Sequence, residues 1–204
     1  MTLDRRQFAT LYKPGAAAPV LVDVPPLRFL QLEGGGDLED ERFREAVAAL
    51  YGLAYPVKFS AKKRLGLAYQ VPPLEAVFRP TRDVDETDPG HRTSLSWRLM
   101  LMVPDEVSGE FIEQVRETVA SKKNPPRLAE IRLQTFSEGT SVQILHVGPY
   151  AEEPRTIERL FAFAEERGFD VTGDHHEIYL GDPHRAAAAK LKTVVRYGVR
   201  KKRG

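Results

Sequence analysis

The alternation of apolar and polar residues predicts several strands, and the clearest is at residues 94–103. Successive side chains of a strand point to opposite sides, so every second residue shares a face. The apolar residues that share one face here are Leu95, Trp97, Leu99, Leu101 and Val103. The other face also becomes apolar toward its end, and we therefore expect a central strand. Weaker alternation predicts strands at 27–32, 176–180 and about 192–199. The adjacent prolines in 67–78 favour a kinked or edge strand there.

Apolar residues spaced three and four apart predict amphipathic helices at 38–50 and 104–122. The apolar stripe of the first helix consists of Phe43, Ala46, Val47 and Leu50. The stripe of the second consists of Val107, Phe111, Val115 and Val119. Residues 51–63 are predicted to hold a helix end and a short strand, 79–91 an exposed loop, and 1–22 an N-terminal arm.

The second half of the chain repeats the pattern of the first at a constant offset of 114 residues. Leu30 matches Ile144, Gly34 matches Gly148, and Phe43 matches Ile157. The order of strand, glycine turn and helix recurs without a gap, which indicates an internal duplication. We therefore predict an α+β fold built from two βαββ units that form one antiparallel sheet. Helices would cover one face, and a concave ligand cleft would lie on the other face near the seam.

The predicted domain spans residues 23–204, with halves at about 23–103 and 128–200 joined by the helix 104–122. The chain has 204 residues and no cysteine, which excludes disulfides and thiolate sites. Its 30 lysines and arginines balance 29 aspartates and glutamates, which argues against direct binding to nucleic acid. No apolar run approaches the ~20 residues of a membrane helix. The N-terminus lacks the apolar segment of a secretory signal. We therefore expect a soluble cytoplasmic protein.

Candidate chemistry is concentrated in the strand at 176–180. Glu177 and Tyr179 point to one face of this strand, whereas Ile178 and Leu180 point to the other. If the apolar pair packs against a helix, a carboxylate and a phenol stand side by side on the opposite face. That arrangement suits a ligand site better than a core. A solvent-facing strand with two ordinary polar residues would show the same pattern.

Segments spread over nearly the whole chain carry a family resemblance. They are LVDVP at 21–25, LYGLAY at 50–55 with Lys58, PLE at 73–75, Trp97, LQTFSEGTSVQILHVGPY at 133–150, HHEIYLGDP at 175–183 and KLKTVVRYGV at 190–199. Together they resemble the GyrI-like family, and in particular its stand-alone proteins that include cyclopropanoid cyclohydrolases. The resemblance implies a GyrI-like or SOUL-like fold of two βαββ halves, with an acidic residue and aromatic walls in a ligand cleft. In the same superfamily this fold also serves as a drug-sensing domain of transcription regulators and as a gyrase-inhibitory protein.

The resemblance makes Glu177 the cleft carboxylate and Tyr179 its neighbour, and both are candidate catalytic residues. The candidate ligand-binding residues are Trp97, Phe78, Tyr55, Tyr69, His146 and Tyr150. One departure from the family pattern follows Glu75, where a glycine and a tryptophan-bearing stretch are expected. This chain has Ala-Val-Phe-Arg at 76–79 instead. Phe78 keeps a flat apolar wall but lacks an indole N–H donor, so binding without turnover stays open.

The resemblance implies hydrolysis of a strained spirocyclopropane conjugated to a dienone, as part of the detoxification of genotoxins. This reaction needs a base that activates water, and hydrogen-bond donors at the carbonyl that becomes a phenoxide. Glu177 is the candidate base, because burial raises the pKa of a carboxylate toward a useful range. Tyr179, Tyr55 and Tyr69 are the candidate donors. A non-catalytic multidrug-binding protein would instead use Glu177 as the counter-ion of a hydrophobic aromatic cation.

Other polar residues allow less specific interpretations. His146 precedes a Gly-Pro-Tyr turn, and a ring at this position more often anchors the turn than serves catalysis. His175 and His176 point in opposite directions on a strand, so we predict no metal and no cofactor. Glu75 is either a second pocket acid or an exposed charge on an edge strand. The basic residues at 196–202 are expected to be exposed at a strand end. DNA gyrase is the alternative partner, through protein surface contacts.

Overall fold

The computed structural model describes residues 5–38, 40–80, 95–123, 125–181 and 186–203. Within these ranges the α-helices are α1 (Arg5–Tyr12), α2 (Glu41–Leu65), α3 (Gly109–Lys122) and α4 (Glu153–Glu166), and the short 3₁₀ turns are η2 (Leu128–Glu130), η3 (Tyr150–Glu152) and η4 (Ala188–Lys190). The strands are β1 (Val20–Val24), β2 (Leu27–Gly35), β3 (Leu74–Pro80), β4 (Leu95–Met102), β5 (Arg132–Phe136), β6 (Gly139–Val147), β7 (Phe169–Val171), β8 (His175–Tyr179) and β9 (Lys192–Lys201). No helix in the described ranges combines the length and the apolar character needed to cross a bilayer.

The described strands form a nine-stranded sheet in the order β1-β6-β9-β8-β3-β4-β2-β5, with β7 beside β9. All neighbouring strands are antiparallel. Counted outward from the β3–β8 pair, the order is β3-β4-β2 on one side and β8-β9-β6 on the other. Each of these halves consists of a strand, a helix and two further strands, as the offset in the sequence predicted. The α+β fold class is therefore confirmed, while the domain boundaries remain a prediction.

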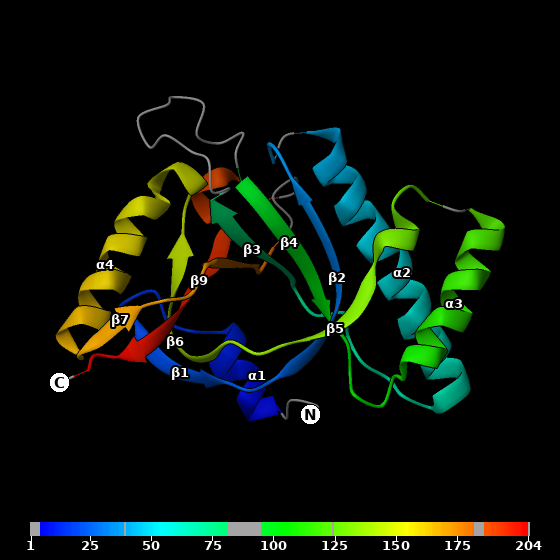
Figure 1. Ribbon diagram of the computed structural model, residues 1–204, viewed down its shortest axis with the longest axis horizontal. Coiled ribbons are helices and arrows are strands. Elements are labelled where there is room, and N and C mark those ends of the chain that lie inside the picture. The colour runs from blue at the N-terminus through cyan, green and yellow to red at the C-terminus, as the bar shows by residue number, and fades with distance from the viewer. Residues whose placement is uncertain (1–4, 39, 81–94, 124, 182–185, 204) are drawn as a thin grey trace.

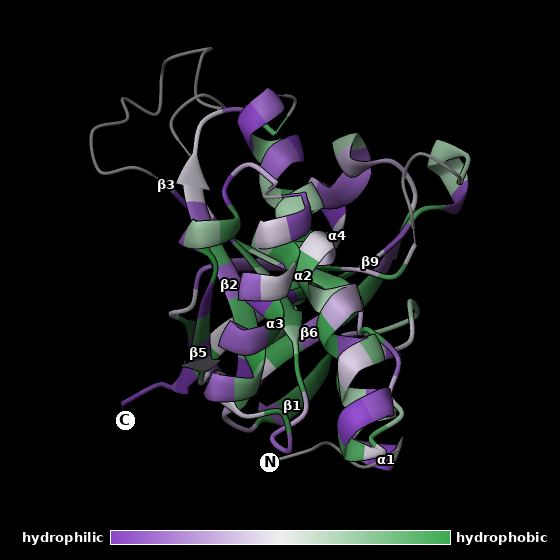
Figure 2. Ribbon diagram, turned by 90° about the vertical axis from the view of Figure 1, so that its right-hand side faces the viewer, coloured by the Kyte–Doolittle hydropathy of each residue, from purple (hydrophilic) through white to green (hydrophobic). Residues whose placement is uncertain are grey.

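One face of the sheet carries three helices. Helices α2 and α3 lie over the first half and α4 over the second (Figure 1). The apolar stripe of α2, including Leu50 and Leu53, packs on Leu99 and Leu101 of β4. In Figure 2, α2 and α3 lie in front of the sheet, and hydrophobic colours are concentrated where the two layers meet. This burial stabilises the fold at roughly 25 cal/mol per Å² of apolar surface removed from water.

The opposite face is partly covered by α1, a helix that the sequence analysis did not predict within the N-terminal arm. Leu11 and Tyr12 at its end are only 3% and 1% exposed. They pack against Val77, Met100 and Ile178, whose side chains point away from α2 and α4. Both faces of the central strands are therefore buried, as the apolar character of both faces of residues 94–103 predicted.

The prediction of a helix end and a short strand at 51–63 is wrong, because α2 continues to Leu65. Pro56 lies inside this helix, where it removes one backbone donor. The apolar stripe nevertheless continues past the proline through Val57 and Ala61, both fully buried. Burial of that stripe outweighs the local cost of the proline, and the helix ends only at Gly66, whose φ is 68°.

The edge position predicted for the strand in 67–78 is also wrong. Regular pairing begins at Leu74, after both prolines, so neither proline removes a donor from the ladder. Strand β3 is consequently central, between β4 and β8. Most of the predicted loop 79–91 lies outside the described residues. Helix α3 starts at Gly109, later than predicted, where the Ser108 side chain accepts a hydrogen bond from the Phe111 N–H.

Candidate functional site

Strand β8 directs Glu177 and Tyr179 to the face that carries α2 and α4. Glu177 lies opposite Ala76 of β3 and Val195 of β9, two residues in the cores beneath these helices. The prediction that the site faces the helix-free side is therefore wrong. Ile178 does pack against a helix, but that helix is α1 on the other side of the sheet. The alternation was interpreted correctly, and the error lay in assuming only one helical layer.

Three side chains of the second half form an acidic cluster beside the β3–β8 seam: Glu153, His175 and Glu177. The Nε2 atom of His175 lies 2.7 Å from Glu177 Oε1 and 3.8 Å from Glu153 Oε2. Its Nδ1 atom lies 2.6 Å from the hydroxyl of Tyr197. Glu153 is 6% exposed and Glu177 is 8% exposed, so two carboxylates are buried side by side. Only one of them can carry a charge at low cost.

Burial raises the pKa of Glu153 to about 8, and the neighbouring Glu177 carboxylate contributes to this shift. Glu153 therefore holds a proton at neutral pH, shared with Glu177 through a hydrogen bond. It begins α4, so the pair lies at the positive end of a helix dipole. Glu153 Oε1 is buried without a hydrogen-bond partner.

Tyrosine side chains surround the cluster. Burial and then Glu177 hold the pKa of Tyr179 well above its usual range, and burial raises the pKa of Tyr150 to about 12. Burial also raises the pKa of Tyr197, with contributions from Glu153 and Glu177. These phenols therefore stay neutral donors at physiological pH. Tyr150 packs edge-on against Tyr179, with ring centroids 6.2 Å apart, and is 38% exposed. Within the cluster itself, His175 is the most exposed side chain, at 21%.

The aromatic candidates on the sheet lie in one row across it. Trp97 pairs with Phe78, and Phe78 pairs with His175. The rings of Phe78 and His175 are 5.9 Å apart, which places Phe78 next to the acidic cluster. Trp97 is only 2% exposed and lies farther along the row, with Phe43 packed edge-on against its ring. Trp97 is therefore a core residue, and it lies beside Phe78 on the neighbouring strand.

The remaining candidates lie in different surroundings. Tyr55 is 44% exposed on α2 and stacks on Tyr51 and Phe59. His146 is buried, with Nδ1 2.9 Å from Thr156 Oγ1 and Nε2 3.2 Å from the Pro149 carbonyl oxygen. Both ring nitrogens thus anchor the turn into α4, and the ligand-binding role of His146 stays a prediction. Tyr69 is half-buried, and its hydroxyl lacks a partner.

Sequence reasoning missed Glu153, His175 and Tyr197 as members of the site. His175 lies two residues before Glu177, and the same alternation that paired Glu177 with Tyr179 could have included it. The sequence analysis considered it only as a metal-binding partner of His176. Glu153 comes from another element, and the packing of α4 on the sheet is needed to place it.

The acidic cluster also offers a possible metal geometry. One ligand atom from each of Glu153, His175 and Glu177 lies within 4.8 Å of the others. The hydrogen bond between His175 and Glu177 already occupies two of these ligand atoms, whereas Glu153 Oε1 has no hydrogen-bond partner. The absence of a metal stays a prediction.

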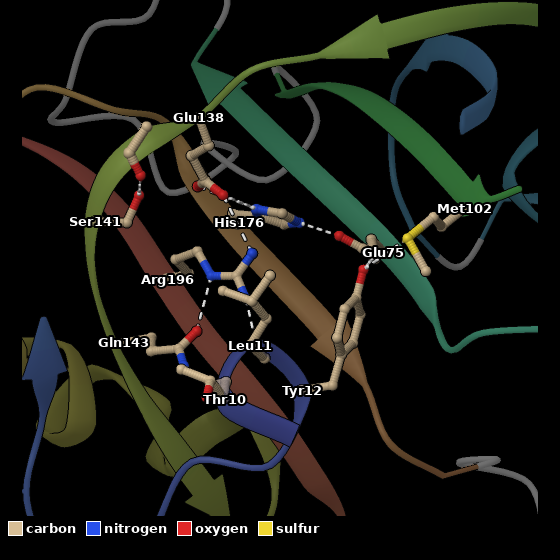
Figure 3. A network of polar contacts seen from close by, with 11 residues as sticks. Thr10, Leu11, Tyr12, Glu75, Met102, Glu138, Ser141, Gln143, His176 and Arg196 are labelled. Atoms are coloured by element: carbon tan, nitrogen blue, oxygen red, sulfur yellow. Dashed lines mark hydrogen bonds and ion pairs between the residues drawn. The ribbon is translucent and has the colours of Figure 1, made fainter. Parts of the chain in front are cut away.

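A second polar network lies on the opposite face of the same strands (Figure 3). His176 bridges Glu75 at 3.0 Å and Glu138 at 3.1 Å, and Arg196 bonds Glu138 at 3.2 Å. The Tyr12 hydroxyl donates to Glu75 at 2.5 Å. Glu75 is only 1% exposed, so the alternative of an exposed edge charge is wrong. Arg196 is 2% exposed, so the predicted exposure of the basic residues 196–202 is wrong at this residue, whereas Arg200, Lys201 and Lys202 are exposed.

Charge balance explains why this network can be buried. Burial alone would lower the pKa of His176, but Glu138 and Glu75 raise it to about 9. Burial alone would raise the pKa of Glu138, but His176 and Arg196 lower it to about 2. Buried charges are tolerated when they are paired and hydrogen-bonded, as they are here.

Comparison with known proteins identifies the family of this chain. Residues 17–198 match the sequence model of the GyrI-like small molecule binding domain. This chain belongs to the GyrI-like family. The match covers both halves of the sheet and the acidic cluster, and it begins after α1. A search of curated proteins gave no match.

Solved structures of GyrI-like proteins agree closely with this fold. An uncharacterized conserved protein from Listeria innocua is 35% identical, with a TM-score of 0.87, covering 96% of this chain and 98% of its own. Two structures described as hydrolases from Listeria innocua are 33% and 32% identical, with TM-scores of 0.84 and 0.86 and the same coverage. The C-terminal domain of EcmrR shares the fold at 14% identity, with a TM-score of 0.54, covering 90% of this chain and 97% of its own.

Proposed function

We propose that this GyrI-like protein binds flat, hydrophobic small molecules at the acidic cluster and hydrolyses cyclopropane-bearing electrophiles among them. The observation that carries the proposal is the buried pair of Glu177 and a protonated Glu153, hydrogen-bonded to His175 and surrounded by aromatic rings. The family's small-molecule-binding character supports the ligand class. The two Listeria hydrolases, about a third identical, support hydrolysis.

In the proposed reaction, Glu177 accepts a proton from a water molecule as the water oxygen bonds to a cyclopropane carbon. The strained C–C bond breaks, and its electron pair moves through the conjugated ring to the distant carbonyl oxygen. That oxygen becomes a phenoxide and then takes up a proton, so the net change is the addition of one water. Positioned proton transfer of this kind is typically worth ~10²–10⁴-fold in rate.

The surrounding residues hold Glu177 ready for this step. The Tyr179 hydroxyl and the His175 ring are both hydrogen-bonded to its carboxylate and restrict its orientation. The proton on Glu153 removes the repulsion that a second negative charge would cause. Phe78 offers a flat apolar surface beside His175 on which an aromatic ligand can stack.

The test is the substitution Glu177→Gln, with Glu165→Gln on the exposed side of α4 as the matched control. Each protein is incubated with a cyclopropanoid alkylating agent, and the ring-opened alcohol is measured by mass spectrometry. We expect the Glu177 variant to lose at least ~100-fold in rate and the control to keep full activity. A Glu177 variant as fast as the parent would remove this residue from the mechanism.

The negative charge of Glu177 also supports a role in ligand binding without catalysis. An ionised carboxylate beside aromatic faces also suits an aromatic cation, through charge pairing and cation–π attraction. If Glu177 is only a counter-ion, Glu177→Gln weakens the binding of cationic ligands and no ligand is turned over. If it is the base, the variant keeps most of its affinity for neutral ligands while turnover is lost.

A further inference from the structure

The acidic cluster brings three potential metal-ligand atoms together on one face of the sheet. His175 and Glu177 come from β8, and Glu153 comes from the start of α4. One ligand atom from each of the three lies within 4.8 Å of the others. His175 and Glu177 are two residues apart on a strand and therefore share a face. The sequence analysis considered a metal only between His175 and His176, which point in opposite directions.

The separations between these atoms are close to those around a zinc ion. Zinc binds carboxylate oxygen and imidazole nitrogen at about 2.0–2.2 Å, and tetrahedral geometry then separates two ligand atoms by roughly 3.3–3.6 Å. His175 Nε2 lies 2.7 Å from Glu177 Oε1 and 3.8 Å from Glu153 Oε2. Each distance is within ~1 Å of the spacing around zinc. Small side-chain movements would therefore let all three atoms contact one ion.

Glu153 supplies an independent indication that a ligand belongs at the cluster. Its side chain is only 7% exposed, and its carboxylate is directed at His175 through Oε2. Its Oε1 atom is buried without a hydrogen-bond partner. A buried polar atom without a partner is costly, and native proteins keep few of them. A cation bound at this carboxylate would remove the cost.

Charge balance distinguishes the cluster from the polar network on the opposite face. In that network Arg196 pairs with Glu138 and supplies a permanent positive charge. Among the residues that the structure describes, no lysine or arginine forms an ion pair with Glu153 or Glu177. Buried carboxylates are stable when a positive charge pairs with them or when they coordinate a metal. A divalent cation would neutralise both acids at once.

The second ring nitrogen of His175 is already held by Tyr197. His175 Nδ1 lies 2.6 Å from the Tyr197 hydroxyl. In the tautomer whose Nδ1–H donates to this hydroxyl, Nε2 carries the lone pair that a metal needs. Histidines that bind metals almost always have such a partner on the other nitrogen, because it fixes the ring and its tautomer. Tyr197 therefore suits the role of an outer partner that does not touch the ion.

We propose that Glu153, His175 and Glu177 form a binding site for a zinc-class divalent ion, with a fourth position left for water. One imidazole and two carboxylates suit zinc, whereas calcium takes about six to eight oxygen ligands and magnesium demands octahedral oxygen ligands. The ion replaces the proton shared by the two acids, and this proton passes to solvent. The inference goes beyond the proposed function and departs from the prediction of no metal, which considered only His175 and His176.

The first test uses the full chain, freed of metal with EDTA and dialysed, with zinc chloride as the probe. Titration calorimetry is expected to show one zinc ion bound per chain. At free zinc of ~100 times the dissociation constant, the melting temperature should rise by ~5–10 °C. Calcium chloride at the same concentration should shift it by less than ~1 °C. Absence of zinc binding, or an equal shift with calcium, would overturn the inference.

Three variants locate the ion, with Glu165→Gln on the exposed side of α4 as the matched control. Glu153→Gln and His175→Gln each remove one ligand and should weaken zinc binding at least ~100-fold. Tyr197→Phe removes only the outer partner of His175 and should weaken it ~10–100-fold. The control should bind zinc as the parent does. If both ligand variants also bind zinc as tightly as the parent, the ion lies elsewhere and the inference is overturned.

Zinc binding and the proposed reaction can fail separately. If the parent binds zinc at the cluster but opens no cyclopropane, even after treatment with EDTA, the proposed function is rejected and the metal site stands. If Glu177→Gln abolishes turnover while Glu153→Gln and His175→Gln keep the zinc affinity of the parent, the hydrolase proposal stands and the metal site is rejected.

Discussion

At the scale of single residues, the proton shared by Glu153 and Glu177 is the centre of the proposed site. Holding two carboxylates in a buried site is costly once both are ionised, and a functional role would explain why the chain retains both. The cost also makes the pair visible in the pH dependence of stability, which needs neither a ligand nor an activity assay.

The substitution Glu153→Gln should stabilise the protein at alkaline pH. Because the pKa of Glu153 is raised to about 8 in the folded state, the folded protein holds a proton that the unfolded chain releases. Stability is therefore lost as pH rises from about 4.5 to 8. The variant should show a gain of about 1–3 kcal/mol at pH 9 and little gain at pH 5, measured by urea unfolding. An equal effect at both pH values would contradict the shared proton.

The sequence predicted part of this site. Glu177 and Tyr179 followed from the two-residue period of one strand, and Phe78 from the family resemblance. Glu153 could not be predicted, because it depends on how the start of α4 packs on the sheet. The burial of Trp97 could not be predicted either, because it depends on Phe43 from a helix distant in sequence, and its role as a ligand wall stays a prediction.

At the scale of elements, periodicity located the strands and helices well but not their ends. Helix α2 extends 15 residues beyond the predicted end at Leu50, because the stripe facing the sheet stays apolar beyond Pro56. Helix α1 was missed, since eight residues give too short a pattern and its stability comes from packing on the sheet. In both cases tertiary contacts outweighed local propensity.

Close packing of β2 on β4 makes Gly34 sensitive to substitution. A Cβ atom added at Gly34 would lie 2.2 Å from Cη2 of Trp97, so the indole would have to move. Gly34→Ala should cost about 1–3 kcal/mol, whereas Gly15→Ala, which meets no atom within 4 Å, should change stability by less than about 0.5 kcal/mol. Trp97 is the single tryptophan of the chain, so its fluorescence spectrum should shift in the first variant alone. An unchanged spectrum in Gly34→Ala would contradict this packing.

At the scale of the whole molecule, the two halves meet at the β3–β8 pair, and the network in Figure 3 crosses that seam. Glu75 comes from one half, and His176 and Arg196 come from the other. Tyr12 adds α1, which lies outside the matched family region. The internal duplication that predicted the fold could not reveal this network, because at the 114-residue offset Glu75 falls on Ala189, His176 on Lys62 and Glu138 on Val24.

His176→Gln should weaken the seam in a pH-dependent way. The folded-state pKa of His176 is about 9, above its ordinary value near 6.5, so its contribution is complete below pH 6.5. That contribution is lost as pH rises through 9. The variant should be less stable than the parent by about 3 kcal/mol at pH 6 and by much less at pH 10, in urea unfolding. A deficit that does not change with pH would show that the ring acts only by packing.

The pairing of β3 with β8 also sets the electrostatic surroundings of the acid pair. Directly across the seam from Glu177 the first half presents Ala76, whose methyl group carries no charge. Two acids facing each other there would lie close enough to repel, beside a carboxylate pair that already shares one proton. The uncharged Ala76 therefore spares the acid pair a further repulsion from the first half of the chain.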